Sequence, residues 1–198
     1  MKMRTMKKIA VVAMAIAVMA VALAACESGE NSNDQETGTD SEPSRERFPS
    51  FEGKTLEGSD INSGVFAQNS VTVVNFWFSD CPPCLAELGE LNEVNEELKK
   101  YGGEVIGVNT YTFGGDEKAI KEAAGILNQK KASYRNLWVS KDSDLAKLTK
   151  EIVGYPTTYV VDRNGTIVGE PILGGIDNEA LKEELQKQID SATAVESQ

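Results

Sequence analysis

The feature that most constrains the fold is a buried-strand pattern that leads directly into two cysteines and a helix. Residues 71–78 are β-branched and aromatic on both faces, as in a central strand covered by helices. A C-x-x-C motif, Cys81 to Cys84, follows at once, and apolar residues then recur at three- and four-residue steps over residues 85–98. The pattern therefore predicts that Cys81 lies at a helix N-terminus, where the helix dipole favours a thiolate.

The rest of the segment 48–190 alternates between strand and helix patterns. This order predicts an α/β domain, a three-layer sandwich with a mixed sheet whose central strands are parallel and whose C-terminal hairpin is antiparallel. The expected elements are a strand pair within 48–61, strands at 105–108, 134–139 and 157–161, an Asn-Gly turn leading to a strand at 166–168, and helices at 116–129, 143–152 and 177–189.

The N-terminal residues 1–25 have the pattern of an export signal. Four basic residues lie within the first eight positions, and an uncharged apolar run follows to residue 25. The run ends in Leu-Ala-Ala before Cys26, which resembles a bacterial lipobox, so we expect Cys26 to carry a lipid. An uncleaved membrane anchor and an ordinary signal with a chance cysteine are the alternatives. Each of these interpretations places the domain on the extracytoplasmic side of the cell membrane.

Two further segments are expected to lack regular structure. Residues 26–47 hold no aromatic or β-branched aliphatic residue, so they are interpreted as a lipidated N-terminus and a flexible acidic linker, and residues 191–198 as a disordered tail. Removing residues 1–25 leaves 16 of the 20 basic residues and all 31 acidic ones, a net charge of about −15. Such a domain repels nucleic acid, so membrane attachment is expected to depend on the lipid.

The inventory of reactive residues excludes several classes of protein. The chain has three cysteines and no histidine. With Cys26 assigned to the lipid, the remaining pair lacks the third and fourth soft ligands of a closed zinc site. Histidine-dependent catalytic triads and metalloproteases are excluded for the same reason. We therefore expect neither a metal nor another cofactor.

Several short motifs occur in a fixed order along the domain. They are Val74-Asn75-Phe76-Trp77, Cys81-Pro82-Pro83-Cys84, Glu87, Val108-Asn109, Tyr155-Pro156-Thr157-Thr158-Tyr159-Val160-Val161-Asp162 and Asn164-Gly165. In order and spacing, residues 48–189 resemble the TlpA/ResA group of membrane-anchored thiol-disulfide oxidoreductases with a thioredoxin-like fold. The helix and strand expected between Asn109 and Pro156 are similar to the insertion of that group.

The resemblance implies roles for individual residues. Cys81 would be the attacking thiolate and Cys84 the resolving thiol of a redox-active disulfide. Pro156 would be cis and would lie over the cysteine pair, with a trans proline before an edge strand as the alternative. The substrate-binding residues would be Tyr155, Pro156, Trp77 and Asp80.

Glu87 is the candidate for proton transfer. It follows Cys84 by one helical turn, and partial burial would raise its pKa enough for it to accept the Cys84 proton. A solvated glutamate on the outer face of the helix is the alternative. Asn75 stands where cytoplasmic thioredoxins carry a buried acid. An amide does not transfer protons as a carboxyl group does, so a proton relay cannot run through Asn75. Asp80 replaces the tryptophan that usually precedes the first cysteine.

The function expected from these residues is that of a monomeric reductant of disulfides in exported proteins, recharged by a CcdA-type membrane electron donor. Relatives in the group serve cytochrome c maturation or supply electrons to extracellular reductases, and the sequence does not choose between these roles. The alternatives are a disulfide oxidant or isomerase and a non-catalytic lipoprotein that uses the fold for binding. A peroxidase is disfavoured because the Thr-x-x-Cys context is absent.

Overall fold

The structure is a computed structural model that describes residues 46–194. The predictions for residues 1–25, for Cys26 and for 195–198 lie outside the described residues, as does most of the expected linker. Within 46–194, no helix combines the length and apolar character needed to cross a membrane.

Seven strands form one mixed sheet in the order β2-β1-β5-β4-β3-β6-β7. The neighbouring strands β3, β4 and β5 are parallel, whereas the strands on either side of them pair antiparallel. This confirms the predicted mixed sheet with parallel central strands. The strands are β1 (Glu52–Thr55), β2 (Asp60–Asn62), β3 (Val71–Trp77), β4 (Glu104–Asn109), β5 (Arg135–Val139), β6 (Thr157–Asp162) and β7 (Ile172–Leu173).

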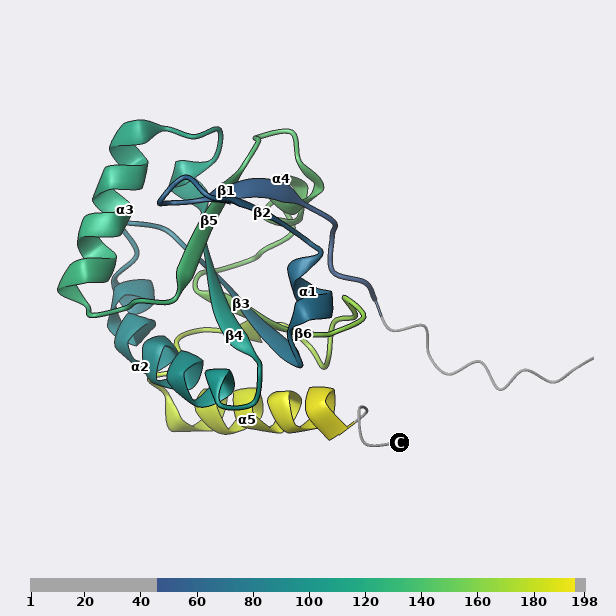
Figure 1. Ribbon diagram of the computed structural model, residues 1–198. Helices are drawn as coiled ribbons and strands as arrows, with labels where there is room; N and C mark the ends of the chain where they lie inside the picture. The colour runs from purple at the N-terminus through teal and green to yellow at the C-terminus, as the bar shows by residue number, and fades with distance from the viewer. Residues whose placement is uncertain (1–45, 195–198) are drawn as a thin grey trace, which may run out of the picture. The chain divides into compact units, whose positions relative to one another are not determined.

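Helices cover both faces of the sheet (Figure 1). Three of them, α2, α3 and α5, contribute to one apolar core, whereas α1 and α4 contribute to the core on the opposite face. The three-layer α/β/α prediction is thus confirmed. The helices are α1 (Val65–Gln68), α2 (Pro82–Lys99), η1 (Thr110–Thr112), α3 (Glu117–Gln129), α4 (Asp144–Leu148) and α5 (Glu179–Ala194).

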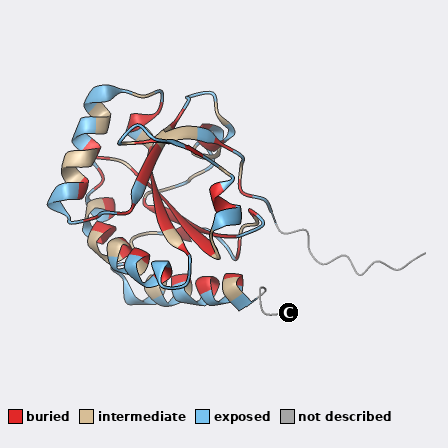
Figure 2. Ribbon diagram, in the orientation of Figure 1, coloured by how far each residue is buried: buried red, intermediate tan, exposed pale blue. Residues whose placement is uncertain are grey.

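Strand β3 lies inside the sheet between β4 and β6, and each of its seven residues is buried (Figure 2). Because side chains alternate along a strand, Val73 and Trp77 face the core under α2, and Val74 and Phe76 face the opposite core. Burial on both faces explains the continuous β-branched and aromatic run that predicted this strand. The strand ends at Trp77, four residues before Cys81, and so delivers the motif to the start of α2.

The expected strand at 166–168 is wrong in detail. The Asn-Gly turn forms, with the N–H of Gly165 donating to the carbonyl of Asp162 at 2.9 Å, but residue 167 makes only an isolated bridge to β6. Gly169 then adopts φ 73°, and Pro171 has no N–H to donate. These two residues interrupt the pairing, and the strand that accompanies β6 forms later, as β7.

Three helix predictions also differ from the structure. The helix expected at 143–152 is capped by Ser143 and stops at Leu148, and the short helix α1 was not expected. The last helix runs to Ala194, beyond its predicted end at 189, so residues 191–194 are not a disordered tail. The extension has a physical cause, since Ala192 is buried in the core beneath α2.

The last two residues of the predicted linker are ordered against the domain. The carbonyl of Glu46 accepts from the N–H of Ile167 at 2.8 Å, and the Arg47 guanidinium donates to the carbonyl of Asn164 at 2.6 Å. These bonds pair the segment with the Asn-Gly turn, a partner that local composition does not reveal. The domain therefore begins at or before residue 46, earlier than the predicted boundary at 48.

Candidate active site

The two motif cysteines form a disulfide at the N-terminus of α2. Their sulfurs are 2.03 Å apart, and Cys81 is the N-cap of the helix. Pro82 and Pro83 occupy the first two helical positions, where their missing N–H groups cost no helical hydrogen bond. The next N–H along the chain, that of Cys84, donates to Cys81 Sγ at 3.3 Å. Cys81 is 3% exposed and Cys84 is fully buried, so only the first cysteine has an edge open to a substrate.

The Tyr155–Pro156 peptide bond is cis, as predicted. Pro156 directly precedes β6, whose Thr157 is in register with Phe76 near the end of β3. This register places Pro156 at the same end of the sheet at which β3 leads into the cysteine motif. The N–H of Gly174 donates to the Pro156 carbonyl at 2.9 Å and fixes the following loop against it.

Glu87 is a buried carboxyl group, so the alternative of a solvated glutamate is wrong. Its side chain is completely inaccessible to solvent, and it accepts hydrogen bonds from Asn75 Nδ2 at 2.8 Å and from the N–H of Ile176 at 2.9 Å. Burial raises the pKa of Glu87 from 4.5 to about 7; the two hydrogen bonds lower it, and the nearby Asp177 charge raises it. A carboxyl with this pKa exchanges protons readily near neutral pH.

A row of polar side chains, interrupted by one glycine, crosses the sheet on the same face as Glu87. The register places Thr158, Asn75, Gly107 and Asn136 opposite one another on β6, β3, β4 and β5. Asn75 Nδ2 also donates to Thr158 Oγ1 at 3.0 Å, and this second hydrogen bond keeps the amide nitrogen pointing toward Glu87. Asn75 thus has a defined role, to hold the Glu87 carboxyl group in place.

Trp77 was expected among the substrate-binding residues, and this expectation is wrong. The side chain is completely buried, and its indole N–H donates to Asn136 Oδ1 at 2.8 Å. The Asn136 amide reaches the tryptophan by crossing directly over Gly107, where a Cβ would lie only 2.0 Å from the amide oxygen. Trp77 is therefore a core residue anchored by a hydrogen bond.

Tyr155 and Asp80, the remaining predicted substrate-binding residues, do reach the surface next to the motif. Tyr155 is partly exposed and its ring packs edge-on against Phe78, with centroids 5.3 Å apart. Asp80 is exposed directly before Cys81. Their accessibility permits the expected contact with a substrate.

The structure adds three supporting residues to those predicted. Ile176 donates to Glu87 from the loop before α5, Asn136 anchors Trp77, and Asn109 donates to Ser79 Oγ at 3.2 Å in the segment before Cys81. The asparagines have a signal in the sequence, because each is a polar residue in a strand whose other residues are mostly apolar. Ile176 has none, since it acts through its backbone N–H.

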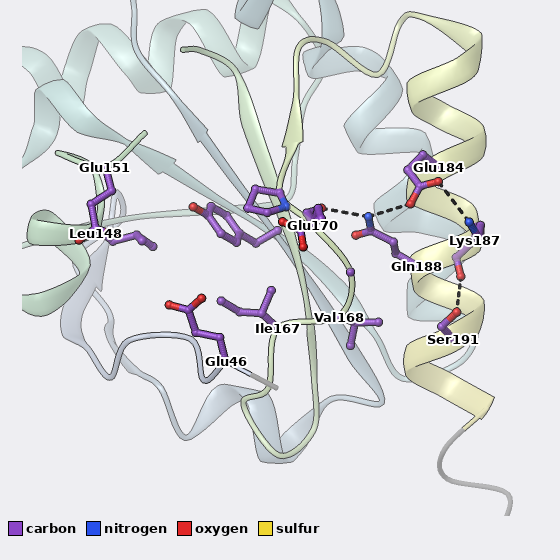
Figure 3. Close-up of a pocket in the computed structure, with 13 residues that line it drawn as sticks. Glu46, Leu148, Glu151, Ile167, Val168, Glu170, Glu184, Lys187, Gln188 and Ser191 are labelled. Carbon is purple, nitrogen blue, oxygen red and sulfur yellow. Dashed lines mark hydrogen bonds and ion pairs between the residues drawn. The ribbon is translucent and has the colours of Figure 1, made fainter. Parts of the chain in front are cut away.

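A cavity of about 760 Å³ opens elsewhere on the domain, between the segment after the Asn-Gly turn and α5 (Figure 3). Its lining includes Glu46, Glu151, Tyr159, Glu170 and Gln188, and neither cysteine nor Pro156 belongs to it. This cavity is therefore separate from the cysteine motif.

A bonded C-x-x-C pair at a helix N-terminus, next to a cis-proline on this three-layer fold, defines a thiol-disulfide oxidoreductase of the thioredoxin-like class. Comparisons with known proteins agree. The chain is 31% identical over 139 residues to the thiol-disulfide oxidoreductase ResA of Bacillus cereus, covering 69% of this chain and 70% of that protein. It is 27% identical over 121 residues to a thiol:disulfide interchange protein DsbE homolog of Paracoccus denitrificans, covering 61% of each.

A solved structure shows the same fold. The thioredoxin domain of a thiol-disulfide oxidoreductase from Bacteroides vulgatus matches with a TM-score of 0.58 and 25% identity, covering 73% of this chain and 96% of that one. The family model described as AhpC/TSA family matches residues 45–169. The chain belongs to this family and is a thiol-disulfide oxidoreductase.

Proposed function

We propose that the protein works as a reductant on the extracytoplasmic side of the membrane, where its dithiol form reduces disulfides in exported proteins. The observation that carries this proposal is the scarcity of backbone N–H groups that could stabilise a thiolate on Cys81. Of the N–H groups at the start of α2, the two that would follow Cys81 most closely are absent because those positions are prolines. The Cys84 N–H and the helix dipole remain.

The charge next to the motif acts in the same direction. Asp80 places a carboxylate beside Cys81, which disfavours a second negative charge, although its exposure to solvent screens part of the effect. A less stable thiolate makes the reduced protein less stable relative to the disulfide, which lowers the reduction potential. A low potential is what a reductant of other disulfides requires.

The reaction then proceeds in two exchanges. The Cys81 thiolate attacks a sulfur of the substrate disulfide, the substrate S–S bond breaks, and one substrate sulfur leaves as a thiolate that takes a proton from water. Cys84 then loses its proton to the Glu87 carboxylate and attacks Cys81, which breaks the mixed disulfide and releases the second substrate thiolate. The product is the protein disulfide seen between Cys81 and Cys84.

Glu87 is suited to this step by its position and its pKa. It lies one turn after Cys84 on α2, and positions three residues apart share one face of a helix. Its pKa of about 7 means that, near neutral pH, Glu87 is deprotonated in a large fraction of the molecules and can accept a proton. Burial keeps water away, so the proton passes to a defined acceptor.

The partners follow from the location. The pattern of residues 1–25 and the cysteine at position 26 support export and a lipid anchor on Cys26. A protein that gives two electrons to each substrate needs a source outside the cytoplasm, and a CcdA-type membrane electron donor would supply them. Cytochrome c maturation and electron supply to extracellular reductases are the two candidate roles.

The reduction potential tests the proposal. We expect a value nearer that of thioredoxin, about −270 mV, than that of strong disulfide oxidants, about −120 mV. The measurement is equilibration against thioredoxin or glutathione, followed by the fluorescence of Trp77, which lies in the same core as the disulfide. A potential above about −180 mV, in the range of isomerases, would contradict the proposal and support a disulfide oxidant or isomerase.

A further inference from the structure

Large exposed apolar side chains are concentrated around the Tyr155–Pro156 segment. Among the described residues four such side chains stand out, and three of them adjoin the Tyr155–Pro156 segment: Tyr111 at 48% exposure, Leu173 at 51% and Val153 at 90%. Leu173 pairs with Thr157, the residue after Pro156, and Val153 precedes Tyr155 by two positions. The fourth, Tyr101, lies beyond the far end of α2.

Tyr111 belongs to a connected set of aromatic rings that we call the aromatic shelf, formed by Phe78, Tyr111 and Tyr155. Tyr111 stacks on Phe78 with ring centroids 5.2 Å apart and an interplanar angle of 28°, and Phe78 packs edge-on against Tyr155. The Phe78 carbonyl accepts a hydrogen bond from the N–H of Cys81 at 3.2 Å. The shelf therefore adjoins the attacking cysteine.

Asn109 fixes the shelf relative to the motif. This asparagine, completely buried at the end of β4, accepts a hydrogen bond from the N–H of Tyr111 at 2.9 Å. Its amide nitrogen donates to Ser79 Oγ, between Phe78 and the cysteine. A single side chain thus holds both segments, so the exposed ring of Tyr111 is positioned before any substrate arrives, and little conformational entropy is lost on binding.

We propose that the aromatic shelf binds an apolar side chain adjacent to the substrate cysteine, so that the protein selects polypeptide disulfides flanked by aromatic or large aliphatic residues. This inference rests on the proposed function, because the occupant is the polypeptide whose disulfide Cys81 attacks. The residue directly before Cys81 is the charged Asp80, so Tyr111, contributed by the segment after β4, provides the apolar surface beside the motif. Leu173 and Val153 extend this surface past Pro156.

The test compares three oxidised substrates in single-turnover reduction by the full chain, with Cys26→Ser in every variant so that only the motif cysteines react. Two are disulfide-linked dimers of a short synthetic peptide, one with phenylalanine and one with serine after its single cysteine. The third is glutathione disulfide, which carries no large apolar side chain. We expect the phenylalanine dimer to be reduced about tenfold faster than the serine dimer, as a well-packed aromatic contact allows.

Variants identify the surface responsible. Tyr111→Ala is expected to slow reduction of the phenylalanine dimer about three- to tenfold and to leave glutathione disulfide unaffected, whereas Tyr111→Phe keeps the preference because it keeps the stacked ring. Tyr101→Ala is the matched control, an exposed tyrosine away from the motif, and should change nothing. Leu173→Ser, on the other side of Pro156, should weaken the preference without any disturbance of the stack.

Three outcomes would overturn the inference. Equal rates for the two dimers, with normal reduction of glutathione disulfide, would reject substrate recognition by the aromatic shelf and would leave the reductant proposal intact. A Tyr111→Ala variant that slows all three substrates equally would assign Tyr111 to support of the motif instead of recognition. Failure to reduce any of the three would reject the proposed function itself, and the inference with it.

Discussion

The two faces of the central sheet differ in the chemistry that they bury. The face under α2 and α5 holds the disulfide, the carboxyl group of Glu87 and the row of polar side chains that includes Asn75. The opposite face packs aromatic rings, with Phe76 in edge-on contact with Tyr159 at 5.7 Å and beside Phe48 at 6.4 Å. Both faces are covered by helices and both are almost free of solvent.

The difference shows how one sheet supports both stability and reactivity. A buried carboxyl group is unfavourable unless it is hydrogen-bonded, and Asn75, the side-chain partner of Glu87, occupies a position where an apolar side chain would otherwise pack. The aromatic face has no such demand, so its burial contributes to stability without a polar cost. Substitutions on the two faces should therefore have different consequences for catalysis and for unfolding.

Loss of the attacking cysteine should have the largest effect. Cys81→Ser removes the only sulfur at the surface of the motif, so we expect disulfide reduction to fall to the uncatalysed rate. The measurement is turnover with the peptide dimers, with circular dichroism to verify the fold. A variant that keeps its biological activity would instead favour the non-catalytic binding protein considered from the sequence.

Loss of an aromatic ring on the opposite face should act on stability alone. Phe76 is completely buried, so Phe76→Ala should lower the free energy of unfolding by about 3 to 5 kcal/mol through lost packing and an unfilled cavity. Urea denaturation would measure this loss. Under conditions where the variant is folded, its reduction potential should equal that of the wild type; a shifted potential would show that the two faces are coupled.

Glu87→Gln should slow the second exchange on the order of a hundredfold, because Cys84 loses its proton acceptor. It should also change the pH dependence of stability. The pKa of Glu87 is about 7 in the folded protein and 4.5 otherwise, so the folded chain holds a proton that the unfolded chain releases, and stability falls as pH rises through this window.

The second effect is measurable in the oxidised protein, in which neither motif cysteine titrates. Between pH 5 and pH 8 the wild type should lose roughly 2 to 3 kcal/mol more stability than Glu87→Gln, as urea denaturation at the two pH values would show. Glu93→Gln, an exposed glutamate on the same helix, is the matched control. Identical slopes for wild type and Glu87→Gln would show that the carboxyl group is not held in this raised state.

Local patterns were sufficient for most of the fold. The apolar run of β3, the cysteine spacing and the three- and four-residue periodicity of α2 are properties of contiguous sequence, so they predicted the strand, the motif and the helix. The cis-proline and the disulfide followed from a resemblance carried by short motifs. The predictions that failed at the two ends of the domain concern segments whose partners lie far away in the chain, such as Glu46 with Ile167. The prediction at 166–168 failed because Gly169 and Pro171 interrupt the strand locally.

The sequence by itself determined most of the elements, their order and the identity of the reactive pair, because each of these depends on residues that are neighbours along the chain. Only the tertiary structure decided which side chains meet. It buried Glu87 between Asn75 and the backbone of Ile176, moved Trp77 from the expected substrate surface into the core, and brought Tyr111 onto Phe78. Contacts between distant segments set how far each side chain is buried, and so whether a pKa is raised or a ring is left exposed. Periodicity within one segment does not contain that information.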